Sequence, residues 1–182
     1  MKIRLKLNEL KIGNLKICVF LLVVLNSLLN FTSCNYSFTG ASIPAHIKTI
    51  AIPIFQDQSG SGESELSDMF TKQTIQQFID DNSLQVTDRV NADAILEGTI
   101  LSLTDAPSVV SSGENITTRR ITLTVKVTYR DMVKKRTVFE RNFSNYGDYP
   151  VGGDITTVRK EAIAQAVNRI SEDILLAVVS NW

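Results

Sequence analysis

A strict alternation of apolar and polar residues runs from Ile121 to Tyr129. Odd positions are apolar and even positions are polar, which is the pattern of a strand with one face on the core and the other toward solvent or a partner. Residues Arg130–Lys135 are expected to turn the chain, and Thr137–Phe143 to pair back as a hairpin. The stretch Tyr146–Gly153 that follows is expected to be irregular.

The first apolar stretch of the chain beyond residue 45 is Lys48–Phe55, which also predicts a strand. The period of two places Ile50, Ile52 and Ile54 on one face. Because Pro53 cannot donate a ladder hydrogen bond, this strand is expected at an edge of the sheet or with a bulge at the proline. A further short strand is possible at residues 36–39.

Two more strands are predicted between these, at Leu84–Val86 and at Ile95–Leu103. Gly98 lies in the middle of the longer one, which indicates a bulge or the close approach of another element. The polar interval that follows, Thr104–Thr118, is expected to be a loop of 15 residues, and a loop of that length is usually functional or mobile.

Two stretches have the periodicity of amphipathic helices. The first follows Ser64, the expected N-cap, and ends near Asp81. Its apolar face consists of Leu66, Met69, Phe70 and Phe78, whereas Ile75 and Ile79 lie outside that stripe. The second runs from Ile155 to about Val179 after Asp154 as its cap. Its stripe consists of Ile155, Ala162, Ile163, Ala166, Val167, Ile170, Ile174, Ala177 and Val178.

The predicted order β-α-β-β-β-β-α defines the fold class as α+β. We expect a two-layer sandwich, in which a mixed sheet of four to five strands carries both helices on one face. Residues 46–182 are expected to form this single domain.

The first 33 residues have the pattern of a secretory signal. Residues 1–16 carry five basic side chains and one acidic side chain, and a largely apolar run of 13 residues follows at 17–29. A spanning helix needs about 20 apolar residues, so this run is short for one, although a tilted N-terminal anchor is the alternative interpretation.

The apolar run leads into Phe31-Thr32-Ser33-Cys34, which resembles the lipobox of bacterial lipoproteins. That resemblance implies cleavage before Cys34, acylation of Cys34, and a lipidated tether over residues 34–45. Multiple acyl chains hold a protein stably on a membrane. The alternative is a plain signal peptide with Cys34 as a free thiol. Cys18, the other cysteine, lies in the removed segment, so no disulfide is expected in the mature chain.

Charge changes the picture once the signal is removed. The whole chain has 19 basic and 19 acidic residues, and residues 1–33 contain five of the basic ones and one of the acidic ones. The mature chain therefore keeps 14 basic and 18 acidic residues, and this mildly acidic balance argues against nucleic-acid binding.

No catalytic or metal-binding motif appears in the sequence. There is no GxSxG, Walker, HExxH, EF-hand or CxxC pattern, and His46 is the only histidine. We therefore predict no catalytic residues, no metal site and no cofactor, and we assign His46 no role.

The hairpin carries most of the remaining charge signal. Eight basic residues fall within 119–141, against the acids Asp131 and Glu140. Such a cluster can bind phosphate or carboxylate groups, and the alternative is a solvated strand face whose lysines prevent aggregation. The candidate anion-binding residues are Arg119, Arg120, Lys134, Lys135 and Arg136.

The mature chain as a whole resembles the LPS-assembly lipoprotein family, LptE. The resemblance rests on Tyr36-Ser37-Phe38 shortly after Cys34, Thr49–Phe55, Ala92–Ile100, the alternating Ile121–Tyr129, Glu161-Ala162 and Trp182. It implies a non-enzymatic, lipid-anchored protein on the periplasmic side of the outer membrane. Its implied partners are the LPS-translocon β-barrel LptD, whose lumen it plugs, and lipopolysaccharide. By the same resemblance, the candidate basic residues would meet the phosphates and acidic sugars of LPS.

The alternative is another periplasmic lipoprotein with a similar strand–helix opening, of the curli-secretion or penicillin-binding-protein-activator type. Its function would be secretion-channel assembly or activation of a cell-wall synthase. Co-purification with a barrel of outer-membrane size would separate the two interpretations.

Overall fold

The structure is a computed structural model that describes residues 43–110 and 116–180. The expectations for the signal at 1–33, for Cys34 and its tether, for a strand at 36–39 and for Trp182 fall outside these residues.

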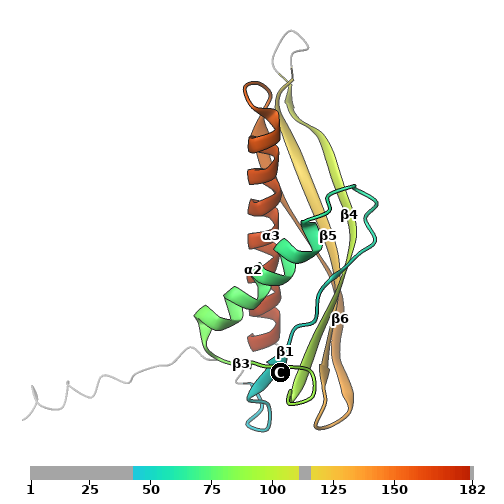
Figure 1. The fold of residues 1–182 in the computed structure, drawn as a ribbon, viewed down its shortest axis with the longest axis vertical. Coiled ribbons are helices and arrows are strands. Elements are labelled where there is room, and N and C mark those ends of the chain that lie inside the picture. The colour runs from blue at the N-terminus through green and yellow to red at the C-terminus, as the bar shows by residue number, and fades with distance from the viewer. Residues whose placement is uncertain (1–42, 111–115, 181–182) are drawn as a thin grey trace, which may run out of the picture. The chain divides into compact units, whose positions relative to one another are not determined.

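Three long antiparallel strands form the main part of the sheet (Figure 1). They are β4 (Ala94–Val110), β5 (Ile116–Asp131) and β6 (Arg136–Pro150), with β5 in the middle. The predicted alternation is confirmed, because all five odd-numbered side chains from residue 121 to residue 129 are buried. The hairpin prediction is also confirmed, with residues 132–135 between the paired Asp131 and Arg136.

The predicted loop at 104–118 is wrong over most of its length, because β4 continues to Val110 and β5 begins at Ile116. Cross-strand pairing imposes the extended conformation there, although the sequence does not alternate. Pro107 is tolerated because β4 has no described partner on its other side at that point. The prediction of an irregular stretch at 146–153 is likewise wrong as far as Pro150, because β6 runs to that residue.

The predicted strand at 48–55 is broken in two. Strand β1 (Thr49–Ala51) pairs in parallel with both β3 (Gln85–Val86) and β4, so it is not an edge strand as expected. Strand β2 (Gln56–Asp57) pairs in parallel with β4 after the break that contains Pro53. The break turns Ile54 outward, 70% exposed, and buries Phe55 instead.

Gly98 permits the close approach that its position predicts. A Cβ at residue 98 would lie 1.9 Å from Cε1 of Phe55. The Phe55 ring is fully buried and its centroid is 4.7 Å from that of Phe70. The backbone N–H of Phe55 donates a hydrogen bond of 3.0 Å to Thr71 Oγ1, which fixes this segment on the first helix.

That helix, α2 (Leu66–Asp81), buries Leu66, Phe70 and Phe78, as predicted from its apolar stripe. The prediction of Ser64 as N-cap is wrong: Glu65 has that position, without a side-chain cap bond. The helix begins one residue later because a turn closes first, with Leu66 N–H donating to Glu63 O.

The second helix, α3 (Ile155–Ser180), begins at the predicted cap. Asp154 Oδ1 accepts hydrogen bonds from the backbone N–H groups of Thr156 and Thr157, at 3.1 and 3.4 Å. The predicted stripe is buried except at its first member, since Ile155 in the first turn is 50% exposed. Gly147 of β6 lets this helix approach, because a Cβ there would lie 2.0 Å from the carbonyl oxygen of Ala162.

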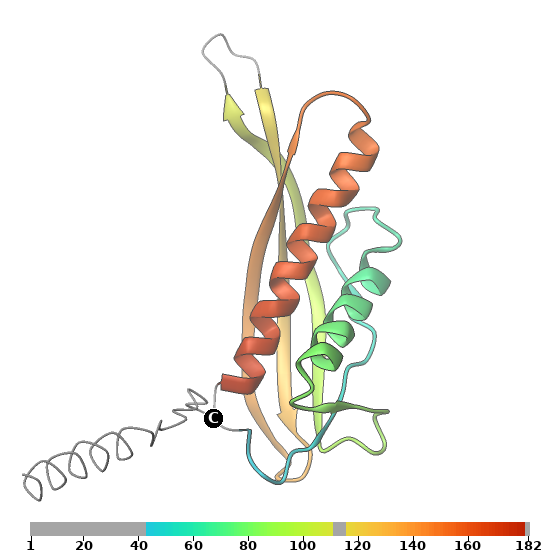
Figure 2. The same cartoon turned by 90° about the vertical axis from the view of Figure 1, so that its left-hand side faces the viewer.

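Both helices lie on the same side of the sheet (Figures 1 and 2). The predicted two-layer α+β class is confirmed, with parallel and antiparallel pairs in a six-stranded sheet of order β3-β1-β4-β5-β6, to which β2 adds by pairing with β4. The sixth strand results from the break at Pro53.

Candidate functional site

The face of the sheet that points away from the helices is polar. It presents the even-numbered residues of β5 and their partners on β6, which include Thr122, Thr124, Lys126, Thr128, Glu140, Asn142 and Ser144. Thr124 and Ser144 are hydrogen-bonded through their hydroxyls at 3.1 Å, and Lys126 Nζ is 2.6 Å from Glu140 Oε1. In the described part of the chain no helix covers this face, which we call the open face.

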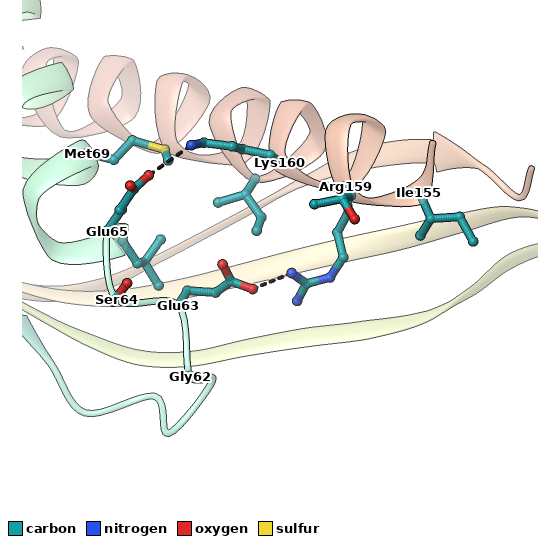
Figure 3. Close-up of a pocket in the computed structure, with 11 residues that line it drawn as sticks. Gly62, Glu63, Ser64, Glu65, Met69, Ile155, Arg159 and Lys160 are labelled. Atoms are coloured by element: carbon teal, nitrogen blue, oxygen red, sulfur yellow. Dashed lines mark hydrogen bonds and ion pairs between the residues drawn. The ribbon is translucent and has the colours of Figure 1, made fainter. Parts of the chain in front are cut away.

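A groove of about 310 Å³ lies on the helix side, where the loop before α2 meets the first turns of α3 (Figure 3). Leu66, Met69 and Ile163 supply its apolar lining. Two ion pairs bridge it, Glu63 with Arg159 and Glu65 with Lys160, the latter at 2.8 Å. These pairs join the loop at 62–65 to α3.

The Arg159 side chain extends this bridge to the sheet. Its Nε is 3.3 Å from Asp105 Oδ2 on β4. Asp105 also accepts hydrogen bonds from Arg119 Nε on β5 at 2.8 Å and from Tyr149 Oη on β6 at 2.7 Å. We call Glu63, Asp105, Arg119, Tyr149 and Arg159 the strand–helix network, because they tie all three long strands to α3.

Electrostatics favours the charged form of Asp105 within this network. Burial acts to raise the pKa of the Asp105 carboxyl, but the hydrogen bonds from Tyr149 and Arg119 outweigh it and hold that pKa below its usual value. Sequence analysis treated Asp105 as a loop residue and missed this network. The signal was present: Arg119 is two residues before Ile121, so the alternation extended by one step places Arg119 on the helix side, where an acidic partner is needed.

Arg120 points the other way and is also engaged. Its guanidinium donates two hydrogen bonds to the carboxylate of Asp148, at 2.7 and 2.8 Å, and lies 3.7 Å from the ring centroid of Tyr146. The Arg120 guanidinium lowers the pKa of Asp148 below its ordinary value. Arg169 of α3 donates to the Tyr146 carbonyl oxygen at 2.8 Å, at the edge of β6.

The five candidate anion-binding residues do not form one cluster. Arg119 and Arg120 lie toward one end of β5, whereas Lys134, Lys135 and Arg136 lie beyond its other end, about 35 Å away along the strand. The first two are bonded to acids. Within the described residues, the side chains of Lys134 and Lys135 form no ion pair. The prediction that these residues contact LPS stays a prediction.

His46, to which we assigned no role, contacts the base of the β5–β6 turn. Its Nε2 is 2.9 Å from Oδ2 of Asp131, a fully buried carboxylate that also accepts the backbone N–H of Lys134 at 2.8 Å. Burial acts to raise the pKa of Asp131, and these hydrogen bonds bring it below its usual value.

Two kinds of site have no counterpart in the described part of the chain. It contains no group of three or more His, Cys, Asp or Glu side chains placed to hold a metal ion. Nor does it contain a helix long and apolar enough to cross a membrane. The predicted lipidation residue, Cys34, lies outside the described residues.

Several solved structures share this fold. Protein XCC0632 from Xanthomonas campestris aligns with a TM-score of 0.54 and 13% identity, over 76% of this chain and 89% of that one. The hypothetical protein CT253 from Chlamydia trachomatis aligns with a TM-score of 0.55 and 10% identity, over 74% of this chain and 97% of that one. The rare lipoprotein B from Shewanella oneidensis aligns with a TM-score of 0.50 and 13% identity, over 73% of this chain and 95% of that one. At these identities the likeness supports the fold alone.

Sequence comparison is more specific. No curated protein sequence matches the chain. The family model described as "LptE: Lipopolysaccharide-assembly" matches residues 47–178, which include every described strand, helix α2 and all of α3 except its last two residues. That match covers well over half of the sequence, and the chain therefore belongs to the LptE family of lipopolysaccharide-assembly proteins.

Proposed function

We propose that this chain is the lipoprotein subunit of an outer-membrane LPS translocon. It assembles with an LptD-like β-barrel, plugs the lumen of that barrel, and assists the transport and insertion of LPS at the cell surface. Membership of the LptE family supports this role. The observation that carries it is the open face of the sheet, which spans the long strands β5 and β6 and carries hydroxyl, amide and charged groups.

The interior of a large outer-membrane barrel is polar and water-filled, so a plug needs a surface rich in hydrogen-bonding groups. The open face meets this need, while the opposite face of the sheet is buried under α3 by residues such as Leu123 and Val125. The domain therefore has a core of its own and presents a polar surface to the barrel wall.

Anchoring completes the proposal. Acylation of Cys34 would hold the protein on the inner leaflet of the outer membrane, and Asn35 rather than Asp after Cys34 favours outer-membrane retention by resemblance to lipoprotein sorting. The role requires no catalytic step and no cofactor, and we assign none.

Direct contact with LPS is the finer part of the proposal. Lys134, Lys135 and Arg136 have side chains accessible to phosphate groups, whereas Arg119 and Arg120 would have to exchange their carboxylate partners for LPS phosphates. Charge reversal to Glu in each group separately should weaken binding of purified LPS. Unchanged binding in both variants would remove direct LPS contact from the proposal.

Co-purification tests the central claim. An affinity tag on the full chain should recover a barrel of outer-membrane size from detergent extracts, in amounts equal to the tagged protein. Recovery of a cell-wall synthase or a secretion channel in place of this barrel would favour the alternative lipoprotein types instead.

A matched pair of variants tests the open face. Lysines placed at its centre, Thr124→Lys with Ser144→Lys, should reduce recovery of the barrel. The control, Gln76→Lys with Gln165→Lys, adds the same charge on exposed helix positions and should leave recovery unchanged. Equal recovery with both pairs would show that the open face does not contact the barrel.

A further inference from the structure

We propose that one end of the domain rests on the surface of the phospholipid bilayer that holds the N-terminal lipid. The contact is made by two turns, at residues 88–91 and 132–135, through the apolar side chains Val90, Met132 and Val133 and the cations Lys134, Lys135 and Arg136. We call these six residues the turn surface. The inference rests on the proposed function only for the lipid anchor at Cys34.

The apolar members of the turn surface are well exposed. Val90 is 92% exposed, Val133 54% and Met132 42%. Turns favour Gly, Asn, Asp, Ser and Pro, so apolar residues at both tips are not explained by turn chemistry. Single exposed apolar residues are normal on a protein surface, but here three occur in two turns. Figures 1 and 2 show these two turns at the same end of the sheet.

Both turns are held in place by an aspartate. Asp88 Oδ1 accepts the backbone N–H groups of Val90 at 3.1 Å and Asn91 at 3.0 Å. Asp131 Oδ1 accepts the backbone N–H of Lys134 at 2.8 Å in the other turn. The two turns therefore present their apolar tips in fixed positions, which reduces the entropy lost on binding.

A backbone hydrogen bond connects the bases of the two turns. Met132 N–H donates to Asp93 O at 2.8 Å, and Asp93 Oδ2 in turn accepts the backbone N–H of Lys48 at 2.9 Å. The turns and the segment that enters the domain thus form one connected end of the molecule.

The charge at this end suits an anionic surface. Lys134 and Lys135 form no ion pair within the described residues, and Arg136 is 56% exposed, 3.9 Å from Asp131. The neighbouring exposed acid, Asp88, uses its carboxylate to accept backbone N–H groups of its own turn. Cations around a small apolar patch are the composition of interfacial membrane-binding surfaces, which combine attraction to phosphate headgroups with shallow burial of apolar side chains.

The chain enters the domain at the same end. Residues 43–48 lie beside the two turns (Figures 1 and 2). His46 of this segment is hydrogen-bonded to Asp131, at the base of the β5–β6 turn. Eight residues lie between Cys34 and residue 43, and the nine residue-to-residue steps of an extended chain reach about 30 Å. An acylated Cys34 would therefore keep the turn surface within reach of the leaflet that holds its acyl chains.

A tryptophan probe tests the contact in the full chain as the cell processes it. Val133→Trp is made in a Trp182→Phe background, with Ser144→Trp on the open face as the matched control. Vesicles of phosphatidylethanolamine and phosphatidylglycerol, with brominated acyl chains as quenchers, should quench the Val133→Trp variant several-fold more than the control. Equal quenching of the two variants would overturn the inference. The mass of the purified chain reports acylation of Cys34 independently, so a missing anchor is distinguished from a missing contact.

Charge variants and a change of vesicle identify what is recognised. Lys134→Gln with Lys135→Gln should weaken association of the turn surface with anionic vesicles roughly thirtyfold. Lys72→Gln with Lys160→Gln removes the same charge from exposed helix positions and should leave the association unchanged. A blue shift of the Val133→Trp emission on addition of LPS dispersions, without quenching by the brominated phospholipid vesicles, would assign the turn surface to LPS and overturn the inference. If the Val133→Trp probe becomes shielded from solvent only when the barrel is present, the turn surface binds a protein partner, and the inference is also overturned.

Discussion

Gly98→Ala should destabilise the domain, although alanine is ordinarily the better residue in a strand. Gly in a strand interior costs roughly 0.5–1 kcal/mol relative to Ala through backbone entropy, so an unobstructed site would gain stability from the exchange. At residue 98 the new methyl group would lie 1.9 Å from Cε1 and 2.0 Å from Cδ1 of Phe55.

The size of the effect follows from what surrounds the Phe55 ring. Carbon atoms in contact are about 3.5–4.0 Å apart, so the ring would have to move by more than 1.5 Å, roughly half of a normal contact distance. It is fully buried and packs on Phe70, with a centroid separation of 4.7 Å, which leaves little room for that movement. Overpacking costs typically about 1–3 kcal/mol, and we expect about 3 kcal/mol here. For a domain of this size that corresponds to a fall in Tm of about 10 °C.

A double-mutant cycle measured by urea denaturation checks this reasoning. Phe55→Ala alone should cost about 3–5 kcal/mol, because it leaves a cavity. In that background the clash is gone, so adding Gly98→Ala should cost less than about 1 kcal/mol, since the new methyl group fills part of the cavity. A cost for Gly98→Ala that is the same in both backgrounds, or a gain in stability in the wild-type background, would refute the close approach as the cause.

Three further predictions concern other contacts. Gly147→Ala should lower the free energy of unfolding, measured by denaturation, by at least about 3 kcal/mol. Adding Ala162→Gly should not restore stability, because the new methyl group meets the backbone carbonyl oxygen of residue 162 and not its side chain; restored stability would contradict this. Asp105→Asn should lower the free energy of unfolding near neutral pH. The pKa of Asp105 is lower in the folded protein than in the unfolded chain, so its stabilising contribution is present at neutral pH and is lost as the carboxylate is protonated below about pH 4. The difference in stability from wild type should therefore disappear at low pH, and a difference that does not change with pH would contradict the network. Asp154→Ala should cost about 1 kcal/mol by removing the cap of α3, visible as a Tm lower by a few degrees, whereas Asp154→Ser should retain most of the stability.

The parts of the fold that sequence predicts well are those in which local pattern and burial agree. The alternation at 121–129 belongs to the central strand β5, which packs on α3 along one face and has pairing partners on both sides. The cap at Asp154 depends on atoms only two and three residues away. Neither feature requires knowledge of distant residues.

The predictions that are wrong concern segments whose conformation depends on residues far away in the sequence. The ends of β4 and β5 at 104–110 and 116–118 are extended because they pair with each other, and no local alternation reports this. The proline indicates an irregularity at residue 53, but it does not say which neighbour enters the core. Phe55 rather than Ile54 is buried, in a segment that follows β1 and precedes the pairing of β2 with β4.

Charge along the sequence is a poor guide to charge on the surface for the same reason. The hairpin contains eight basic residues and two acidic ones within 119–141. Acids from other segments neutralise part of this excess: Asp105 and Glu97 of β4 pair with Arg119 and Arg130, and Asp148 pairs with Arg120. Lys126 and Arg136 pair with the two acids of the hairpin itself, Glu140 and Asp131. Within the described residues, Lys134 and Lys135 of the turn form no ion pair.

The lengths of the long strands set a distance. The 16 residues of β5 correspond to about 50 Å, and the full thickness of a bilayer with its headgroups is about 40–45 Å. If the turn at 132–135 lies at the periplasmic surface and the strands run along the barrel axis, the first residue of β5, Ile116, reaches the depth of the outer leaflet. The length of the paired strands β4 and β5 then determines how deep the domain reaches, and removing two paired residues from each strand would shorten that reach by about 7 Å.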